Sequence, residues 1–214
     1  MGRSDKHTLI KASLYRLLAG AYCVIPTPAL VDHLVKRREV WDNVGQLLGD
    51  HGIAEGVSKI KEYLDGIGNQ ESISVAKELG VDRTRLVGGI SEDYGPPPPY
   101  ESVYRDGGIL MGPSTLQVMR WFRDAGVEVV PAGSGKPPDF IGLELDFIRF
   151  MYERAAGESQ EELKFQARAK QFLREHPARW AMAYCERAAP YARTGFYQGI
   201  LKVTAGFIKY ETSV

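Results

Sequence analysis

Four consecutive prolines, Pro96 to Pro99, constrain the fold of this 214-residue chain more than any other stretch. Each proline fixes its φ angle and lacks a backbone N–H, so the run cannot lie inside a helix or a central strand. We predict a stiff, extended connection there, within a central loop over residues 93–112. Gly107 and Gly108 then permit a sharp reversal. Two interpretations stay open: a plain connector between two helical halves, or a rigid aromatic loop that shapes a groove.

On both sides of this loop, apolar residues recur with the spacing of amphipathic helices. The pattern predicts helices over residues 7–22, 29–41, 57–64, 71–79, 114–125, 140–155, 162–176, 178–191 and 195–210. The run 127–130 favours β-structure, and both a short strand and a loop fit it. We therefore expect an all-α protein, with residues 1–214 forming a single compact helical domain of about nine to eleven helices.

Several residues have the character of helix caps. Gly80 and Gly126 follow helical patterns and fit the left-handed position after a helix. Ser114 and Gln117 have the spacing of a capping box. Asp139 precedes the helix expected from residue 140 and is predicted to cap its first turn.

Charge and composition exclude several classes of protein. Lysine plus arginine equals aspartate plus glutamate at 27 each, so no basic surface for nucleic acid is expected. No run of about 18 apolar residues predicts a membrane span. Residues 1–6 lack the apolar stretch of a signal peptide. Cys23 and Cys185 lie far apart in apolar helical patterns, which indicates buried free thiols and a reducing cytoplasm.

No local motif for catalysis or metal binding stands out. The run 133–136 resembles a phosphate-binding loop, but Val130 replaces the required glycine and prolines follow Lys136. None of the four histidines pairs with another at the spacing of a helical metal site, so surface or capping roles are expected. They are His7, His33, His51 and His176. We predict no catalytic residue, metal site or cofactor.

Two carboxylates lie in the most apolar predicted helix. Glu144 and Asp146 are two residues apart and point to different faces, so they do not form an acid–base pair. Glu144 lies near an apolar face, and a buried carboxylate needs partners. A structural role, with an arginine or backbone N–H groups of the central loop as partner, is favoured over catalysis. Asp139 can both cap a helix and meet a cationic ligand at the edge of a groove.

Residues 98–104, Pro-Pro-Tyr-Glu-Ser-Val-Tyr, resemble the central motif of the TorD/DmsD/NarJ family, closest to its TorD/DmsD branch. These are cytoplasmic chaperones that assist the maturation of molybdenum-containing redox enzymes. Residues 138–147 look like the family's second motif, and 14–19 and 171–180 also resemble it. Two positions depart from the pattern: Val87 stands where phenylalanine is more usual, and Phe140 where histidine commonly follows the aspartate.

The resemblance implies a cytoplasmic, non-catalytic chaperone. Such a protein binds the precursor of a molybdenum-containing oxidoreductase, through its twin-arginine leader, its body or both, and supports cofactor insertion before export or assembly. The implied partner is therefore the precursor of a molybdoenzyme catalytic subunit. Nucleic acid and stable membrane insertion are not expected, and two copies can exchange helices to form a homodimer.

The leader offers arginines and an apolar segment, which call for acidic acceptors at the rim of a hydrophobic groove. The groove and the family's binding region are expected at Leu86, Val87, Pro99, Tyr100, Tyr104 and Phe140, with negative charge from Glu101, Asp139 and Glu144. Buried anchors contribute more to binding than exposed ion pairs do. We therefore expect Tyr100→Ala to weaken leader binding more than Glu101→Ala.

Two other classes of function remain open. One is a small all-α enzyme whose site residues are dispersed in the sequence, which a bound metal or turnover of a metabolite would favour. The other is a helical interaction or regulatory module with another protein partner. Affinity capture without any molybdoenzyme subunit would favour that module.

Overall fold

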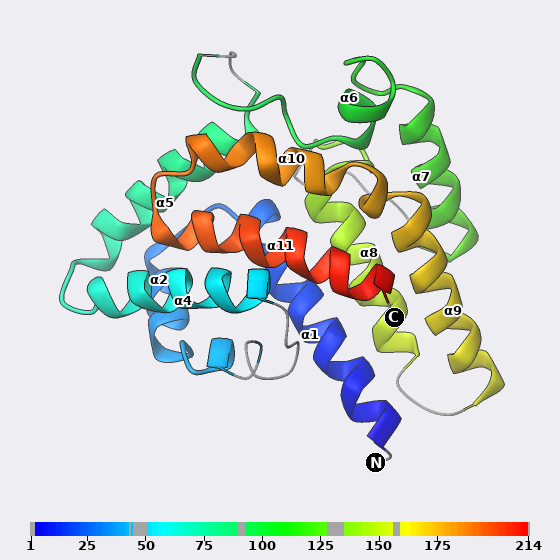
Figure 1. Cartoon of the computed structure of the whole chain (residues 1–214), viewed down its shortest axis with the longest axis horizontal. Coiled ribbons are helices and arrows are strands. Elements are labelled where there is room, and N and C mark those ends of the chain that lie inside the picture. The colour runs from blue at the N-terminus through cyan, green and yellow to red at the C-terminus, as the bar shows by residue number, and fades with distance from the viewer. Residues whose placement is uncertain are drawn as a thin grey trace. The chain divides into compact units, whose positions relative to one another are not determined.

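The structure, a computed structural model, describes residues 3–42, 44, 51–89, 93–127, 135–155 and 159–213. Throughout these ranges the regular structure is helical, and the only β-type pairing is one isolated bridge between Tyr100 and Phe140. The elements in Figure 1 are α1 (Arg3–Cys23), α2 (Pro28–Lys36), α4 (His51–Gly66), α5 (Ser72–Val87), α6 (Glu101–Arg105), α7 (Pro113–Asp124), α8 (Ile141–Arg154), α9 (Gln160–Glu175), η1 (Pro177–Arg179), α10 (Ala181–Ala188), η2 (Ala189–Tyr191) and α11 (Gly195–Ser213). The all-α class and the expected range of helix number are confirmed.

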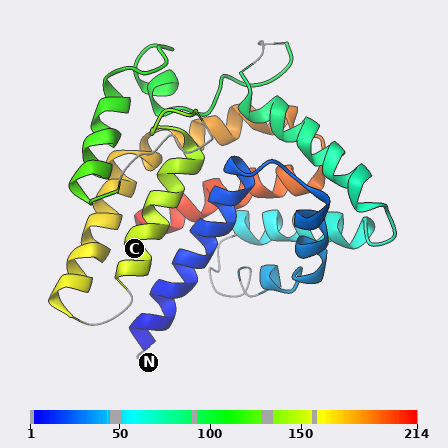
Figure 2. The same cartoon turned by 180° about the vertical axis from the view of Figure 1, so that it is seen from behind.

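The chain divides into two compact units, each built from two separate stretches. Unit 1 comprises residues 1–23 and 99–181, and unit 2 comprises residues 24–98 and 182–214. In unit 1, α1 packs along α8, and α8 packs against α9 (Figure 2). A single domain over the whole chain stays a prediction.

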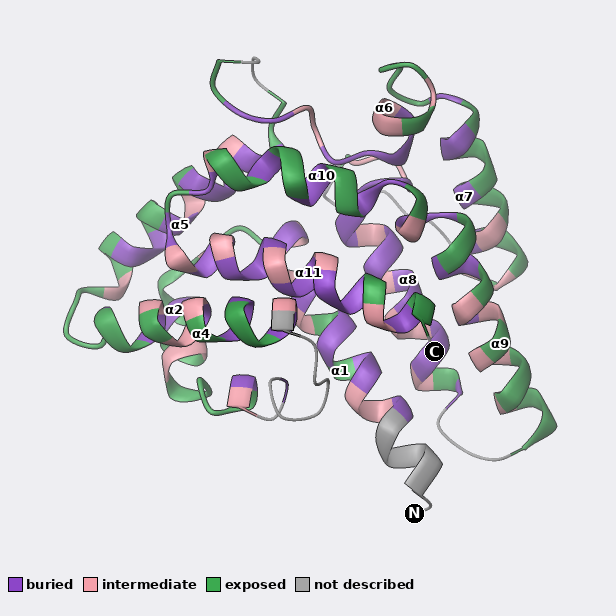
Figure 3. Cartoon of the chain, viewed as in Figure 1, coloured by how far each residue is buried: buried purple, intermediate pink, exposed green. Residues whose placement is uncertain are grey.

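In unit 2, the principal contact joins α4 and α11. Glycines let the two backbones approach closely: a Cβ atom on Gly199 would lie only 2.4 Å from the Gly56 carbonyl oxygen. A Cβ atom on Gly206 would lie 2.8 Å from Cγ1 of Ile53. The core-forming helix of each unit is mostly buried, α8 in unit 1 and α11 in unit 2 (Figure 3).

One predicted helix end is wrong and another is confirmed. Helix α5 continues through Gly80 to Val87, because Leu79 and Leu86 are buried on its inner face. A glycine inside a helix costs only about 1 kcal/mol relative to alanine, so packing outweighs it. Gly126 does follow α7 with a φ angle of 71°, as predicted.

The predicted capping box at the start of α7 is also wrong. The N-cap residue is Gly112, and Ser114 lies inside the helix. Asp106 supplies the cap from the preceding turn, accepting hydrogen bonds from Ser114 N at 2.7 Å and Ser114 Oγ at 2.9 Å. The reversal expected in this turn is confirmed by positive φ angles at Gly107 and Gly108.

Other expectations have mixed outcomes. Neither cysteine forms a disulfide in the described part of the chain, but only Cys185 is buried and Cys23 is half-buried. Residues 128–130 and 133–134 lie outside the described ranges, as do the side chains of His7 and His51. Among the helices that the structure describes, none has the length and apolar character needed to cross a bilayer.

Candidate functional site

The two sequence motifs meet in space within unit 1. Residues 99–101 pair with residues 139–141 in an antiparallel bridge, which we call the motif clasp. Ile141 N donates to the Pro99 carbonyl oxygen and Glu101 N donates to the Asp139 carbonyl oxygen, both at 2.9 Å. The rings of Tyr100 and Phe140 lie 5.4 Å apart between centroids. Two motifs whose bridged residues, Tyr100 and Phe140, are 40 positions apart thus form one local structure.

Asp139 caps a helix, but not the predicted one. Its Oδ2 accepts a hydrogen bond from Ser102 N at 3.0 Å, which satisfies the first turn of α6. The N-cap of α8 is Phe140 and has no side-chain cap. The other carboxylate oxygen, Asp139 Oδ1, is buried and has no hydrogen-bond partner among the residues that the structure describes. A buried, unpaired acceptor is costly, so this atom calls for an explanation.

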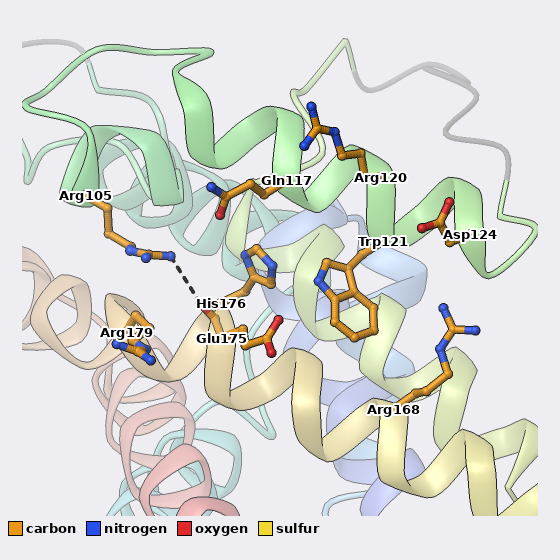
Figure 4. Close-up of a pocket in the computed structure, with 9 residues that line it drawn as sticks. All are labelled: Arg105, Gln117, Arg120, Trp121, Asp124, Arg168, Glu175, His176 and Arg179. Carbon is orange, nitrogen blue, oxygen red and sulfur yellow. Dashed lines mark hydrogen bonds between the residues drawn. The ribbon is translucent and has the colours of Figure 1, made fainter.

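Glu101 connects α6 to the end of α9. Its carboxylate is fully buried and lies 2.7 Å from Nδ1 of His176. The same carboxylate forms an ion pair with Arg105, and Arg105 Nη1 donates to the Glu175 carbonyl oxygen at 3.1 Å (Figure 4). His176 is the C-cap residue of α9, which fits the capping role, but it is buried rather than on the surface.

Glu144 is buried as its sequence position suggested, but its partner differs from the prediction. Its Oε2 accepts a hydrogen bond from the indole N–H of Trp180 at 3.1 Å, rather than from an arginine or a backbone N–H. Burial raises the pKa of Glu144 well above its ordinary value, and the nearby Glu101 raises it further. Burial thus shifts the equilibrium of this carboxyl toward its protonated form relative to an exposed glutamate.

The expected acidic rim is wrong, because Glu101, Asp139 and Glu144 are all 0% exposed. Each of these carboxylates turns inward to a specific donor or cation in unit 1. Pro99, Tyr100 and Phe140 are also buried, and only Tyr104 is half-buried. Leu86 and Val87 are buried residues of unit 2. That these nine residues bind a peptide stays a prediction.

A lysine side chain that the sequence patterns did not indicate lies over the aromatic rings of the clasp. Lys136 Nζ is 4.0 Å from the ring centroid of Phe140 and 5.9 Å from that of Tyr100. Cations within about 6 Å of an aromatic face are attracted by its quadrupole. Lys136 and Phe140 are four residues apart, but this spacing indicates a contact only when the pairing of Phe140 with Tyr100 is known.

A second missed feature is a pocket of about 520 Å³ on unit 1, lined by four arginines and Trp121 (Figure 4). The arginines come from α6, α7, α9 and η1: Arg105, Arg120, Arg168 and Arg179. No spacing rule could link positions so distant in sequence. A metal site has no support within the described ranges, where no three potential ligands gather.

Comparison with known families identifies the class of protein. The family described as nitrate reductase delta subunit matches residues 49–186, which is more than half of the chain. The chain belongs to this family. The match agrees with the family resemblance seen in residues 98–104 and 138–147.

Individual relatives give the same result. The chain is 25% identical to chaperone protein TorD of Vibrio cholerae over 176 residues, which cover 81% of this chain and 77% of the relative. It is 29% identical to chaperone protein TorD of Vibrio vulnificus over 117 residues, 53% of this chain and 54% of the relative. Relatives named as chaperones confirm the expectation of a chaperone family rather than an enzyme family.

Proposed function

We propose that this protein is a cytoplasmic chaperone that binds the precursor of a molybdenum-containing oxidoreductase. It recognises the twin-arginine leader, the body of the precursor or both, and supports cofactor insertion before export or assembly. Family membership supports this proposal, as do relatives named chaperone protein TorD. The single observation that carries the leader-binding part is the cation–aromatic contact of Lys136 with Phe140.

Lys136 occupies a position that a leader arginine can take. An arginine guanidinium is planar and weakly hydrated, so it stacks on an aromatic face at least as well as an ammonium group. Asp139 lies next to Phe140 in the clasp and keeps one buried oxygen without a partner. An incoming cation would gain the attraction of both the ring and the carboxylate, so replacement of Lys136 is favourable.

The nine predicted residues then divide by role. Tyr100, Tyr104 and Phe140 contact the leader, because their rings provide the cation-binding and apolar surface. Glu101, Asp139 and Glu144 hold the clasp in place and act mainly as positioning residues. Contact with Leu86, Val87 or Pro99 requires the leader to displace the groups that now bury them.

Titration calorimetry with a synthetic twin-arginine leader tests this proposal. Phe140→Leu keeps an apolar side chain but removes the aromatic face, and should weaken binding by about tenfold. Lys136→Ala should strengthen binding, because the competing cation is gone. Lys164→Ala, which removes an exposed lysine of α9, should change nothing.

Two outcomes would overturn the arginine-binding role of the clasp. One is equal binding of a leader in which both arginines are replaced by glutamine. The other is weaker binding after Lys136→Ala, which would mean that Lys136 helps the leader instead of occupying its place. Circular dichroism of each variant checks that it folds, since Phe140 is a core residue.

The client itself can be identified by affinity capture from the host, with mass spectrometry of the N-terminal peptide of each captured protein. A molybdoenzyme subunit that retains an uncleaved Arg-Arg leader is the expected result. Recovery of no redox-enzyme subunit, under conditions where the host makes them, would favour the regulatory module instead.

A further inference from the structure

We propose that the arginine-lined pocket of unit 1 is a docking site for an acidic peptide segment of a partner protein. The pocket adjoins the motif clasp through Glu101, which contacts Arg105 and His176 of its lining, so variants at Arg168 and at Phe140, which are not shared, test the two sites separately. The pocket lies between α7 and the end of α9, and its volume of about 520 Å³ falls within the range of roughly 300–1,000 Å³ typical of ligand sites. Figure 4 shows its lining residues.

The arginines leave much of their binding capacity unused. Among the residues that the structure describes, Arg105 alone of the four has a carboxylate partner, Glu101. Arg179 Nε donates to the Arg174 carbonyl oxygen at 3.1 Å, and no acid in the described part of the chain forms an ion pair with Arg179. Arg168 lies over the ring of Trp121, with 5.6 Å from its Cζ to the ring centroid. Guanidinium groups of this kind bind carboxylates through paired hydrogen bonds.

The contact of Arg168 with the Trp121 ring places a guanidinium group in the pocket. The attraction of the ring leaves its N–H groups able to donate to a carboxylate. Trp121 is itself held by packing against the rings of Phe172 and His176. Side chains that are already ordered lose little entropy on binding, which favours a specific complex over nonspecific charge attraction.

The two acids in the lining indicate a peptide rather than a polyphosphate. Asp124 and Glu175 belong to the same pocket as the four arginines. Their negative charges repel a compact, multiply charged phosphate group. A peptide instead places carboxylates against the arginines and can direct backbone N–H groups to Asp124 or Glu175. Gln117 adds an amide that both donates to and accepts from a peptide backbone.

Fluorescence anisotropy with the full-length protein provides the test. The probe is a labelled synthetic peptide of alternating glutamate and glycine, and the matched probe has glutamine in place of glutamate. The glutamate peptide should bind, the glutamine peptide should not, and salt should weaken binding steadily. Arg168→Glu should weaken binding by about tenfold or more, since it places like charges together.

Arg154→Glu is the matched control. It makes the same change of charge in unit 1, but Arg154 is an exposed residue of α8 that does not line the pocket. Equal weakening by Arg154→Glu and Arg168→Glu would show general charge attraction and overturn the proposal. Displacement of the peptide by tripolyphosphate that binds more tightly than the peptide would also overturn it, in favour of a phosphate ligand. Retention of leader binding by Arg168→Glu would separate this site from the clasp.

Discussion

Two buried aspartates, one in each unit, accept hydrogen bonds from segments distant in the sequence, and they differ in how many of their oxygens have partners. In unit 2, Asp82 accepts hydrogen bonds from Thr194 N and Thr194 Oγ1, both at 2.8 Å, and from Arg193 N at 3.1 Å. It also forms an ion pair with Arg85. In unit 1, Asp139 caps α6 through Oδ2 and leaves Oδ1 unpaired.

Asp82 is therefore a structural carboxylate, whereas Asp139 has one oxygen that can still accept a hydrogen bond or contact a cation. Every oxygen of Asp82 is occupied, so removing it can only harm the fold. Asp139 keeps a costly unpaired acceptor beside an aromatic pair that already attracts a cation. Proteins tolerate such a cost where a ligand removes it, which agrees with the proposed part of Asp139 in leader binding.

The largest effect on stability should come from Asp82. Asp82→Ala removes several buried hydrogen bonds that hold Arg193 and Thr194 before α11, and should lower the free energy of unfolding by roughly 3–5 kcal/mol. Asp139→Ala, which removes one cap bond, should cost about 1–2 kcal/mol. Urea denaturation of the two variants measures both values. A larger loss for Asp139→Ala would reverse the roles assigned to the two aspartates.

The close contact of α4 with α11 gives the next largest effect. Gly199→Ala forces a methyl group toward the Gly56 backbone and should destabilise the protein by about 2–3 kcal/mol. Gly80→Ala is the matched control inside α5, where a Cβ atom has nothing within 4 Å. It should stabilise by about 0.5–1 kcal/mol through helix propensity. If both variants were equally stable, α4 and α11 would be less tightly packed than described.

The variant Asp139→Asn separates the part of Asp139 in stability from its proposed part in leader binding. Asparagine keeps an acceptor for Ser102 N, so the change in stability should stay within about 1 kcal/mol. The negative charge is lost, so leader binding should weaken by roughly tenfold. Calorimetry and urea denaturation on the same preparation separate the two effects. Unchanged leader affinity would assign Asp139 to the cap of α6 alone.

The smallest effect is a pH dependence from Glu144. Because its folded pKa is raised, its contribution to stability is fully present below the ordinary carboxyl pKa and is lost as pH rises toward the folded value. Glu144→Gln stays neutral and can still accept from Trp180. Its unfolding midpoint should therefore fall less than that of the native protein across this pH window. Parallel pH profiles for the two proteins would contradict a raised pKa.

Much of the helical pattern could be predicted, because apolar periodicity is a local property of the sequence. The position of Gly126 after α7 was also predictable, because the signals for a helix end lie within one turn. The caps supplied by Asp106 and Asp139 were not, since each acts across a turn or between segments distant in sequence. The prediction at Gly80 failed for a related reason, as burial of Leu79 and Leu86 outweighed a local signal.

The two segments that form the clasp could be recognised from the motif resemblance, but their geometry could not. The resemblance assigned Glu101, Asp139 and Glu144 to the acidic rim of a groove, whereas the structure buries all three. Sequence patterns do not show which carboxylate finds a buried donor, because His176 and Trp180 approach from another part of the chain. The contact of Lys136 with the clasp and the arginine-lined pocket could not be predicted either, because their residues come from separate parts of the chain.

The interleaving of the two units has a consequence for how this protein is made. Synthesis from the N-terminus releases α1 long before α8, its main packing partner, and α4 long before α11. Neither unit has all its segments until residue 181 or later has left the ribosome. A nascent chain therefore carries uncovered apolar helix faces through most of its synthesis, and its folding depends on contacts that close late. This protein, which we propose binds an enzyme precursor before cofactor insertion, thus itself has exposed apolar helix faces until α11 has been synthesised.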